Sequence, residues 1–158
     1  MGQMADSSLG ARYFGSNPWV MVAAQEYLEQ HGEPENSSAL SNHACIVYSS
    51  VQGDDRWRLT SQQYGSQSVQ VKGPFRSNNL SAVLAATTAG MGLAILPLYV
   101  AHESIASGII RHVMQEYSIP SQEMHAVYTS PKLVAKKITN FIDFLQQSFS
   151  GEWWASKL

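Results

Sequence analysis

A short stretch in the middle of the chain, residues 73–97, constrains the fold more than any other part. Its sequence is GPFRSNNLSAVLAATTAGMGLAILP. Apolar residues recur at helical spacing after Asn78, a residue whose side chain can cap a helix by accepting from a backbone N–H. Gly90 suits the left-handed residue that ends a helix. The apolar run Leu93–Leu96 follows and stops at Pro97, which predicts a strand covered on both faces, as in a parallel sheet.

The rest of the chain alternates between expected strands and helices, which places it in the α/β class. The final helix has an apolar stripe formed by Val134, Ile138, Phe141, Ile142, Leu145 and Phe149. We expect Ser130 to cap this helix, Pro131 to occupy its first position, and Ser37 or Ser38 to cap an earlier one. The expected strands are 12–14, 19–24, 45–48, 57–60, 67–71, 93–96 and 124–128, and residues 109–114 are expected to form a strand or an extended link. The expected helices are 26–31, 37–42, 79–89, 98–107 and one from 131, with a turn at 51–56.

Composition and charge exclude several classes of protein. The 158 residues fit one domain or two small lobes, and 44% of them are apolar, enough for a packed core. The sequence contains no run of about 18 apolar residues, so we expect no segment that crosses a membrane. The first residues do not resemble a signal peptide. A single cysteine, Cys45, suits a reducing compartment, so we expect a cytoplasmic protein. A net charge of −2 argues against direct binding of nucleic acid by this chain.

The residues that could carry chemistry favour binding over catalysis. Gly90-Met91-Gly92 follows a helix and precedes a strand, which is the wrong order for a phosphate loop. His43 and Cys45 alternate on one face, but two ligands do not make a zinc site. The aspartates are few, and the sequence lacks the G-x-S-x-G elbow of a serine hydrolase. We therefore expect no catalytic residues, no metal and no cofactor.

The best candidate for binding is the expected helix start at Ser77, Asn78 and Asn79. A helix start offers free backbone N–H groups and the positive end of the helix dipole, which together can hold a small anion. From the residues alone, simple capping explains these three side chains equally well.

Six short motifs, in order and over nearly the whole chain, resemble the effector-binding region of LysR-type transcriptional regulators. The strongest is Ala89–Pro97, which is similar to the family's A-G-x-G-I-A-x-L-P. The others are Val22–Leu28 (V-A-S-P-x-Y-L), Gly32–Pro34 with Leu40 and His43–Cys45 (G-x-P, L, H-x-C), Trp57–Leu59 (W-x-L), Ser107–Gly108 (x-G-x-L) and Phe141–Leu145 (F-I-D-F-L).

This resemblance implies a periplasmic-binding-protein-like fold of type II, with two Rossmann-like lobes and a truncated first lobe. The expected division is 1–24 for the remnant of the first lobe and the first crossing strand, 25–120 for the second lobe, 121–150 for the return strand and C-terminal helix, and 151–158 for the tail. The N-terminal DNA-binding domain of the family has no counterpart in this sequence, so DNA would be bound only through that absent domain.

The resemblance also implies a small effector bound between the lobes and an allosteric response, and the helix start at Ser77–Asn79 favours an anionic one. The residues expected to line the cleft are Ser77, Asn78, Asn79, Ala23, Ala24, Gln25 and Pro97. Relatives usually have Ser-Pro where this chain has Ala24-Gln25, so their effector preference does not transfer. A homodimer, or a higher oligomer, is expected to use the C-terminal helix around Ile138, Phe141 and Leu145.

Two alternatives remain open on the sequence. One is a fragment of a solute-binding transport protein with the same fold. The lone Cys45, and first residues that do not resemble a signal peptide, disfavour it. The other is an enzyme on this fold, which the lack of a catalytic set disfavours. Binding without turnover would favour the sensor, and turnover would favour the enzyme.

Overall fold

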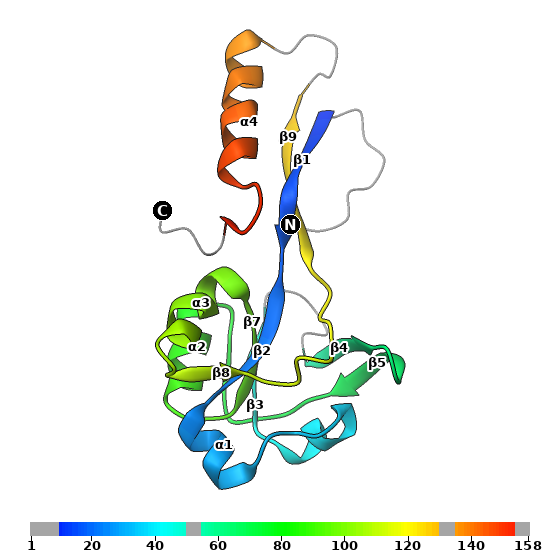
Figure 1. Ribbon diagram of the computed structural model, residues 1–158, viewed down its shortest axis with the longest axis vertical. Coiled ribbons are helices and arrows are strands. Elements are labelled where there is room, and N and C mark those ends of the chain that lie inside the picture. The colour runs from blue at the N-terminus through cyan, green and yellow to red at the C-terminus, as the bar shows by residue number, and fades with distance from the viewer. Residues whose placement is uncertain (1–9, 50–54, 130–134, 154–158) are drawn as a thin grey trace. The chain divides into compact units, whose positions relative to one another are not determined.

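The computed structural model describes residues 10–49, 55–129 and 135–153 (Figure 1). The chain divides into two compact units, of which one comprises Pro18–Pro120 and the other Met1–Asn17 with Ser121–Leu158. The elements of the Pro18–Pro120 unit are β2 (Trp19–Ala24), α1 (Gln25–His31), the 3-10 helix η1 (Ser37–Asn42), β3 (Cys45–Tyr48), β4 (Arg56–Ser61), β5 (Gly65–Gln70), β6 (Arg76–Ser77), α2 (Leu80–Thr88), β7 (Leu93–Pro97), α3 (Leu98–Ala106) and β8 (Ile110–His112).

A mixed five-stranded sheet forms the centre of the Pro18–Pro120 unit. The strand order is β6-β3-β7-β2-β8, and β3 runs parallel to both β6 and β7. β2 runs antiparallel to β7 and β8, so the sheet is not wholly parallel. The predicted strand at Leu93–Leu96 is confirmed: it is the central strand, and all its residues except the half-buried Ile95 are buried.

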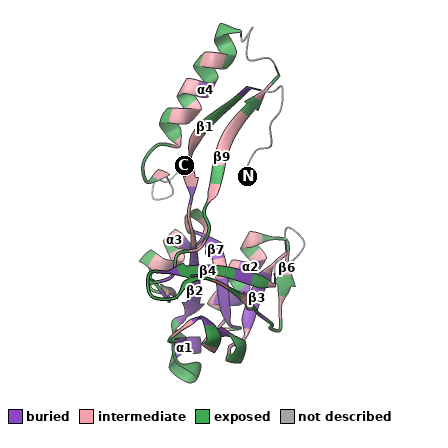
Figure 2. Cartoon of the chain, turned by 90° about the vertical axis from the view of Figure 1, so that its right-hand side faces the viewer, coloured by how far each residue is buried: buried purple, intermediate pink, exposed green. Residues whose placement is uncertain are grey.

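Both faces of this sheet are covered (Figure 1). On one face, α2 and α3 pack their apolar side chains, including the buried Val83 and Ala101, against Val22, Ile46 and Leu96. The other face is covered by a separate apolar cluster that draws on α1, η1 and the β4–β5 hairpin. The buried residues therefore concentrate on β2, β3 and β7 (Figure 2). Burial of alternate side chains on opposite faces explains why these strands read as continuous apolar runs.

The other unit is a two-stranded ribbon with one helix. β1 (Gly10–Asn17) pairs antiparallel with β9 (Gln122–Tyr128), and the register shifts between Tyr13 and Gly15. The helix α4 (Lys136–Ser148) buries Ile142, and Phe149 at its end stacks on Phe14. Trp153 donates from Nε1 to the Ser16 carbonyl at 3.1 Å, so the segment after α4 docks on the ribbon.

Several expected boundaries differ from the structure by one or a few residues. Asn79, not Asn78, caps α2, and Asn36, not Ser37 or Ser38, caps η1. In both cases the side-chain oxygen Oδ1 of the asparagine accepts from the backbone N–H three residues on, a geometry that favours the residue just before the helix. Ser130, Pro131 and Val134, and most of the turn expected at 51–56, lie outside the described residues.

The strand Trp19–Ala24 has the predicted bounds but a different place. It was expected to be the first crossing strand, whereas it lies wholly within the sheet of the Pro18–Pro120 unit. β1 is the strand that pairs with β9, the expected return strand. The structure thus divides the chain near Asn17 rather than after Ala24.

Candidate functional site

Polar residues that could bind a ligand lie together at one edge of the five-stranded sheet. Because β3, β6 and β7 are parallel, their carboxyl ends meet at this edge, with Tyr48 opposite Ser77. Trp19 pairs with Pro97, so the start of the antiparallel β2 lies at the same edge. We call it the C-terminal edge. In open α/β sheets, ligands bind outside the carboxyl ends of the strands.

The start of α2 lies at the C-terminal edge, directly after β6. The Asn79 side chain accepts from the Ala82 N–H at 3.1 Å, and Ser77 Oγ accepts from the Asn79 N–H at 3.1 Å. Ser77 also holds the edge together, because its carbonyl accepts from the Ser49 N–H at 2.8 Å. Helix geometry leaves the N–H groups of Leu80 and Ser81 without an intrahelical acceptor. This first turn can therefore donate to an anion, aided by the helix dipole.

The structure brings four of the seven expected site residues to this edge and separates the other three. Ser77, Asn78 and Asn79 precede α2, and Pro97 ends β7. Ala23 and Ala24 lie at the far end of β2, paired with Arg111 and Ile110. β2 is six residues long, which places them roughly 15 Å along the strand from Trp19.

The three separated residues are also poor donors for a ligand. Ala23 and Ala24 are buried in the core of the unit. Gln25 begins α1 and donates to the Glu29 carboxylate at 2.9 Å. They were expected to face Ser77 because the sequence gives the strand but not its direction in the sheet. β2 runs against β7, so its carboxyl end points to the opposite edge.

Aromatic side chains at the C-terminal edge were not anticipated from the sequence. The rings of Trp19 and Tyr48 lie 5.9 Å apart. Burial, and then the proximity of Tyr48, raise the pKa of Tyr99, which follows β7 on α3. Trp19 Nε1 is buried and has no hydrogen-bond partner among the described residues. A buried donor of this kind costs free energy unless a ligand or water accepts from it.

Cys45 and His43 have structural roles. Burial raises the pKa of the Cys45 thiol to about 12, which makes it unreactive at neutral pH. The Tyr27 hydroxyl lies 3.1 Å from His43 Nδ1 and accepts from the Ala44 N–H at 3.0 Å, tying α1 to the start of β3. No group of three or more potential metal-ligating side chains occurs within residues 10–49, 55–129 and 135–153.

None of the helices in the described part of the chain is long and apolar enough to cross a membrane.

Comparison with known proteins identifies the family. The model of the LysR substrate binding domain matches residues 1–150. The chain belongs to this family. The LysR match also accounts for the arrangement of helices and strands, and it confirms the expected α/β fold of periplasmic-binding-protein-like type.

The LysR relatives named among curated proteins are transcriptional regulators. The chain is 31% identical over 149 residues to the HTH-type transcriptional activator AaeR of Escherichia coli, covering 94% of this chain and 48% of that protein. It is 31% identical over 150 residues to the regulator DmlR of E. coli, covering 92% and 47%. The chain thus spans about half the length of these relatives.

Solved structures of LysR-type regulators share the fold. Full-length AphB of Vibrio cholerae matches with a TM-score of 0.80 and 25% identity, covering 92% of this chain and 50% of that one. The regulatory domain of CrgA of Neisseria meningitidis matches with a TM-score of 0.78 and 25% identity, covering 94% and 72%. This chain corresponds to the effector-binding part of such regulators.

Proposed function

We propose that this chain senses a small anionic effector, bound at the C-terminal edge of the sheet. The observation that carries the proposal is the first turn of α2. Ser77, Asn78 and the N–H groups of Leu80 and Ser81 lie at the same edge of the sheet as Trp19, whose Nε1 has no hydrogen-bond partner among the described residues. A carboxylate accepts several hydrogen bonds at once, and charge-assisted bonds of this type are the strong ones.

The aromatic side chains at the same edge suit an effector with an apolar body. The rings of Trp19 and Tyr48 lie 5.9 Å apart, and Tyr99 is about 41% exposed. A small carboxylate could place its anionic end at α2 and its carbon skeleton against these rings. Ala23, Ala24 and Gln25, expected from the resemblance to share the site, are not part of this proposal because they lie at the opposite edge.

The effector would act on a DNA-binding segment that lies outside this chain. A ligand shifts an equilibrium between two conformations only by its difference in affinity for them. Binding at the C-terminal edge would favour one arrangement of the regulator, and with it one state of DNA binding. We place this activity in the cytoplasm and in a homodimer, as for a regulator acting on chromosomal DNA. We assign the chain neither catalysis nor a role in solute transport.

Calorimetric titration with a panel of small carboxylates tests the proposal. Each compound that binds is titrated again into Ser77→Ala and Asn78→Ala variants. We expect the affinity to fall about tenfold, as for loss of one charge-assisted hydrogen bond. Gln25→Ala is the matched control, because it removes a polar side chain at the opposite edge, and it should bind as the unmodified chain does. Equal loss in all three variants would contradict the proposal.

A further inference from the structure

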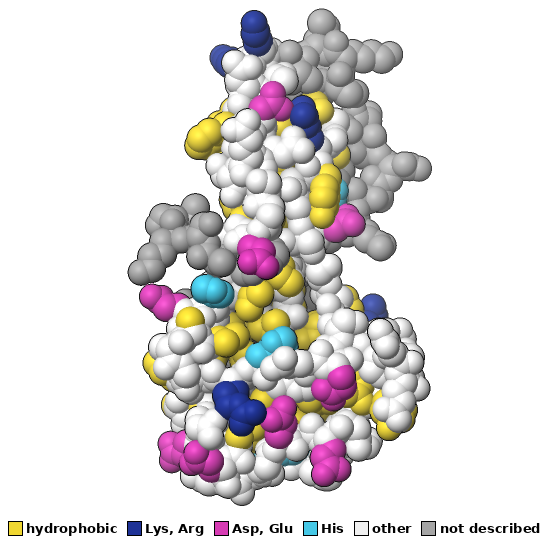
Figure 3. Space-filling model, in the orientation of Figure 1, with side chains coloured by type: hydrophobic (Ala, Val, Ile, Leu, Met, Phe, Trp, Pro, Cys, Tyr) yellow, Lys and Arg dark blue, Asp and Glu magenta, His cyan; other side chains and the backbone are white. Residues whose placement is uncertain are grey.

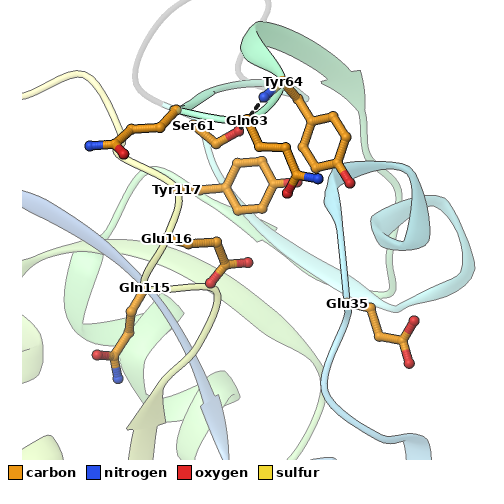
Figure 4. A pocket seen from close by; sticks show the side chains of 8 residues that line it. Glu35, Ser61, Gln63, Tyr64, Gln115, Glu116 and Tyr117 are labelled. Atoms are coloured by element: carbon orange, nitrogen blue, oxygen red, sulfur yellow. Dashed lines mark hydrogen bonds between the residues drawn. The ribbon is translucent and has the colours of Figure 1, made fainter.

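A cavity of about 470 Å³ lies in the Pro18–Pro120 unit, formed by side chains from three separate segments. They are the link between α1 and η1, the turn between β4 and β5, and the loop after β8 (Figure 4). Its size is in the range of small-molecule sites. None of the residues named above for the C-terminal edge, such as Ser77, Asn78 and Pro97, lines this cavity.

The lining combines negative charge with aromatic rings, and none of its described residues carries a positive charge. Glu35 and Glu116 supply two carboxylates, Tyr64 and Tyr117 supply two rings, and the other lining residues are three glutamines and a serine. Neither carboxylate has a hydrogen bond or ion pair among the described residues. The nearby Arg111 is paired with Glu33 at 3.3 Å. An anion would be repelled here, whereas an organic cation would meet carboxylates and ring faces together.

Of the two buried residues in the cavity lining, Ser61 and Tyr117, the larger is Tyr117. It is 94% buried, and its hydroxyl accepts from the Ser37 N–H at 3.3 Å. The hydroxyl's own hydrogen has no acceptor among the described residues. Figure 4 shows the Tyr117 ring among the side chains that line the cavity. A buried donor without an acceptor is a second sign that a ligand or water completes this site.

The walls are held in place before any ligand binds. Thr60 and Ser118 form a two-way backbone bridge of 2.9 and 2.7 Å, which fixes the loop after β8 to β4. The Glu33 carboxylate accepts from the Met114 N–H at 3.3 Å at the start of that loop. A preformed cavity loses less conformational entropy on binding than one that must be assembled.

We infer that this cavity binds a small organic cation, an aliphatic amine or guanidinium compound, as a second ligand besides the effector. The ammonium or guanidinium group lies against Glu35 and Glu116, and the carbon chain lies along Tyr64 and Tyr117. The opposite charge of the two sites keeps their ligands distinct. This inference goes beyond the proposed function and does not depend on it.

Putrescine, which carries an ammonium group at each end, is the probe, with butanediol and succinate as neutral and anionic compounds of matched length. Each is titrated calorimetrically into the full chain and followed by amide chemical shifts. We expect putrescine to bind, to weaken as salt is raised, and to shift the amides of residues 61–64 and 115–117. Butanediol and succinate should not shift these amides.

Isosteric variants decide whether the carboxylates carry the binding. The Glu35→Gln and Glu116→Gln double variant should bind putrescine at least tenfold more weakly, while Glu103→Gln, an exposed change on α3, should bind it unchanged. Asn78→Ala should also leave putrescine binding unchanged, which separates this inference from the effector site. Absence of putrescine binding, equal binding by the double variant, or shifts confined to other residues would overturn the inference.

Discussion

Asn79 links the fold to the candidate site, because one side chain closes the first turn of α2 at the C-terminal edge. Its Oδ1 accepts from the Ala82 N–H, while its own N–H donates to Ser77 Oγ. Asn78, its exposed neighbour, makes no such cap and is free to face a ligand. We propose that the two adjacent asparagines have separate roles, with Asn79 stabilising the helix and Asn78 contacting the effector.

Replacement of each asparagine by alanine should separate these roles. Asn79→Ala should lower the free energy of unfolding by about 1 kcal/mol, the usual cost of a lost cap. Asn78→Ala should change it by less than about 0.5 kcal/mol. Urea denaturation of the two variants measures both values. A larger loss for Asn78→Ala than for Asn79→Ala would show that the cap is misassigned.

His43 gives the unit a pH-dependent contact. The Tyr27 hydroxyl accepts from the Ala44 N–H and lies 3.1 Å from His43 Nδ1, to which it can donate when that nitrogen carries no proton. Burial, and then the charge of His31, lower the pKa of His43 below its usual 6.5. Burial lowers the pKa of His112 in the same way, with Glu33 opposing. In the folded chain, both histidines therefore favour the neutral form more than they do in the unfolded chain.

The stability of the chain should therefore fall on acidification below pH 6.5. The unfolded chain takes up protons at its histidines at a higher pH than the folded chain does. The stabilisation is complete above the unfolded pKa and declines as the pH falls through the folded value. Urea denaturation between pH 7 and pH 5 measures the loss, which should be smaller in His43→Gln. An equal loss in the variant would contradict this role for His43.

At the scale of elements, the turn between α2 and β7 is fixed by two glycines with different constraints. Gly90 has a φ of 73° and open space around its α-carbon. Gly92 has a φ of 151°, and a Cβ there would lie 2.3 Å from the Ala44 carbonyl oxygen. That close approach lets Leu93 pair with Cys45 and so sets β7 beside β3.

The two glycines should differ in their tolerance of alanine. Gly90→Ala should lower the free energy of unfolding by about 1 kcal/mol, because alanine must then adopt a left-handed conformation. Gly92→Ala adds a backbone clash and should cost roughly 3 kcal/mol or more. Thermal unfolding monitored by circular dichroism ranks the two variants. Similar melting temperatures would indicate that the approach of Gly92 to Ala44 is not required for the fold.

These elements show what the sequence could and could not predict. The apolar runs at Trp19–Ala24, Cys45–Tyr48 and Leu93–Pro97 are local, and their strands were predicted within a residue. The antiparallel direction of β2 depends on pairing with β7, more than 70 positions away in the sequence, and no local pattern encodes it. For the same reason, Ala23 and Ala24 were expected beside Ser77, and Trp19 was not expected at the C-terminal edge.

At the scale of the whole molecule, α4 presents an apolar surface. Phe141 and Phe144 are 61% and 63% exposed and Ile138 is 41% exposed, while Ile142, one turn after Ile138, is buried. Figure 3 shows hydrophobic side chains at the surface of this unit. Large exposed apolar side chains close together mark an interaction surface. This surface supports the proposed homodimer, whose commonest closed form is two-fold.

Sedimentation at low micromolar concentration tests the role of α4. We expect a dimer for the unmodified chain and a monomer for a Phe141→Ser and Phe144→Ser double variant, which removes most of the apolar area. Tyr64→Ser, an exposed aromatic change in the Pro18–Pro120 unit, is the control and should remain dimeric. A monomer in all three samples would contradict a dimer through α4.

The central claim is that an anionic effector binds at the start of α2. Its most direct measurement is the set of amide chemical shifts recorded while a carboxylate that binds by calorimetry is titrated into the chain. The account predicts that the largest changes fall on residues 77–81 and that the indole N–H of Trp19 shifts with them. Changes confined to Ala23, Ala24 and Gln25, at the opposite edge of the sheet, would contradict it.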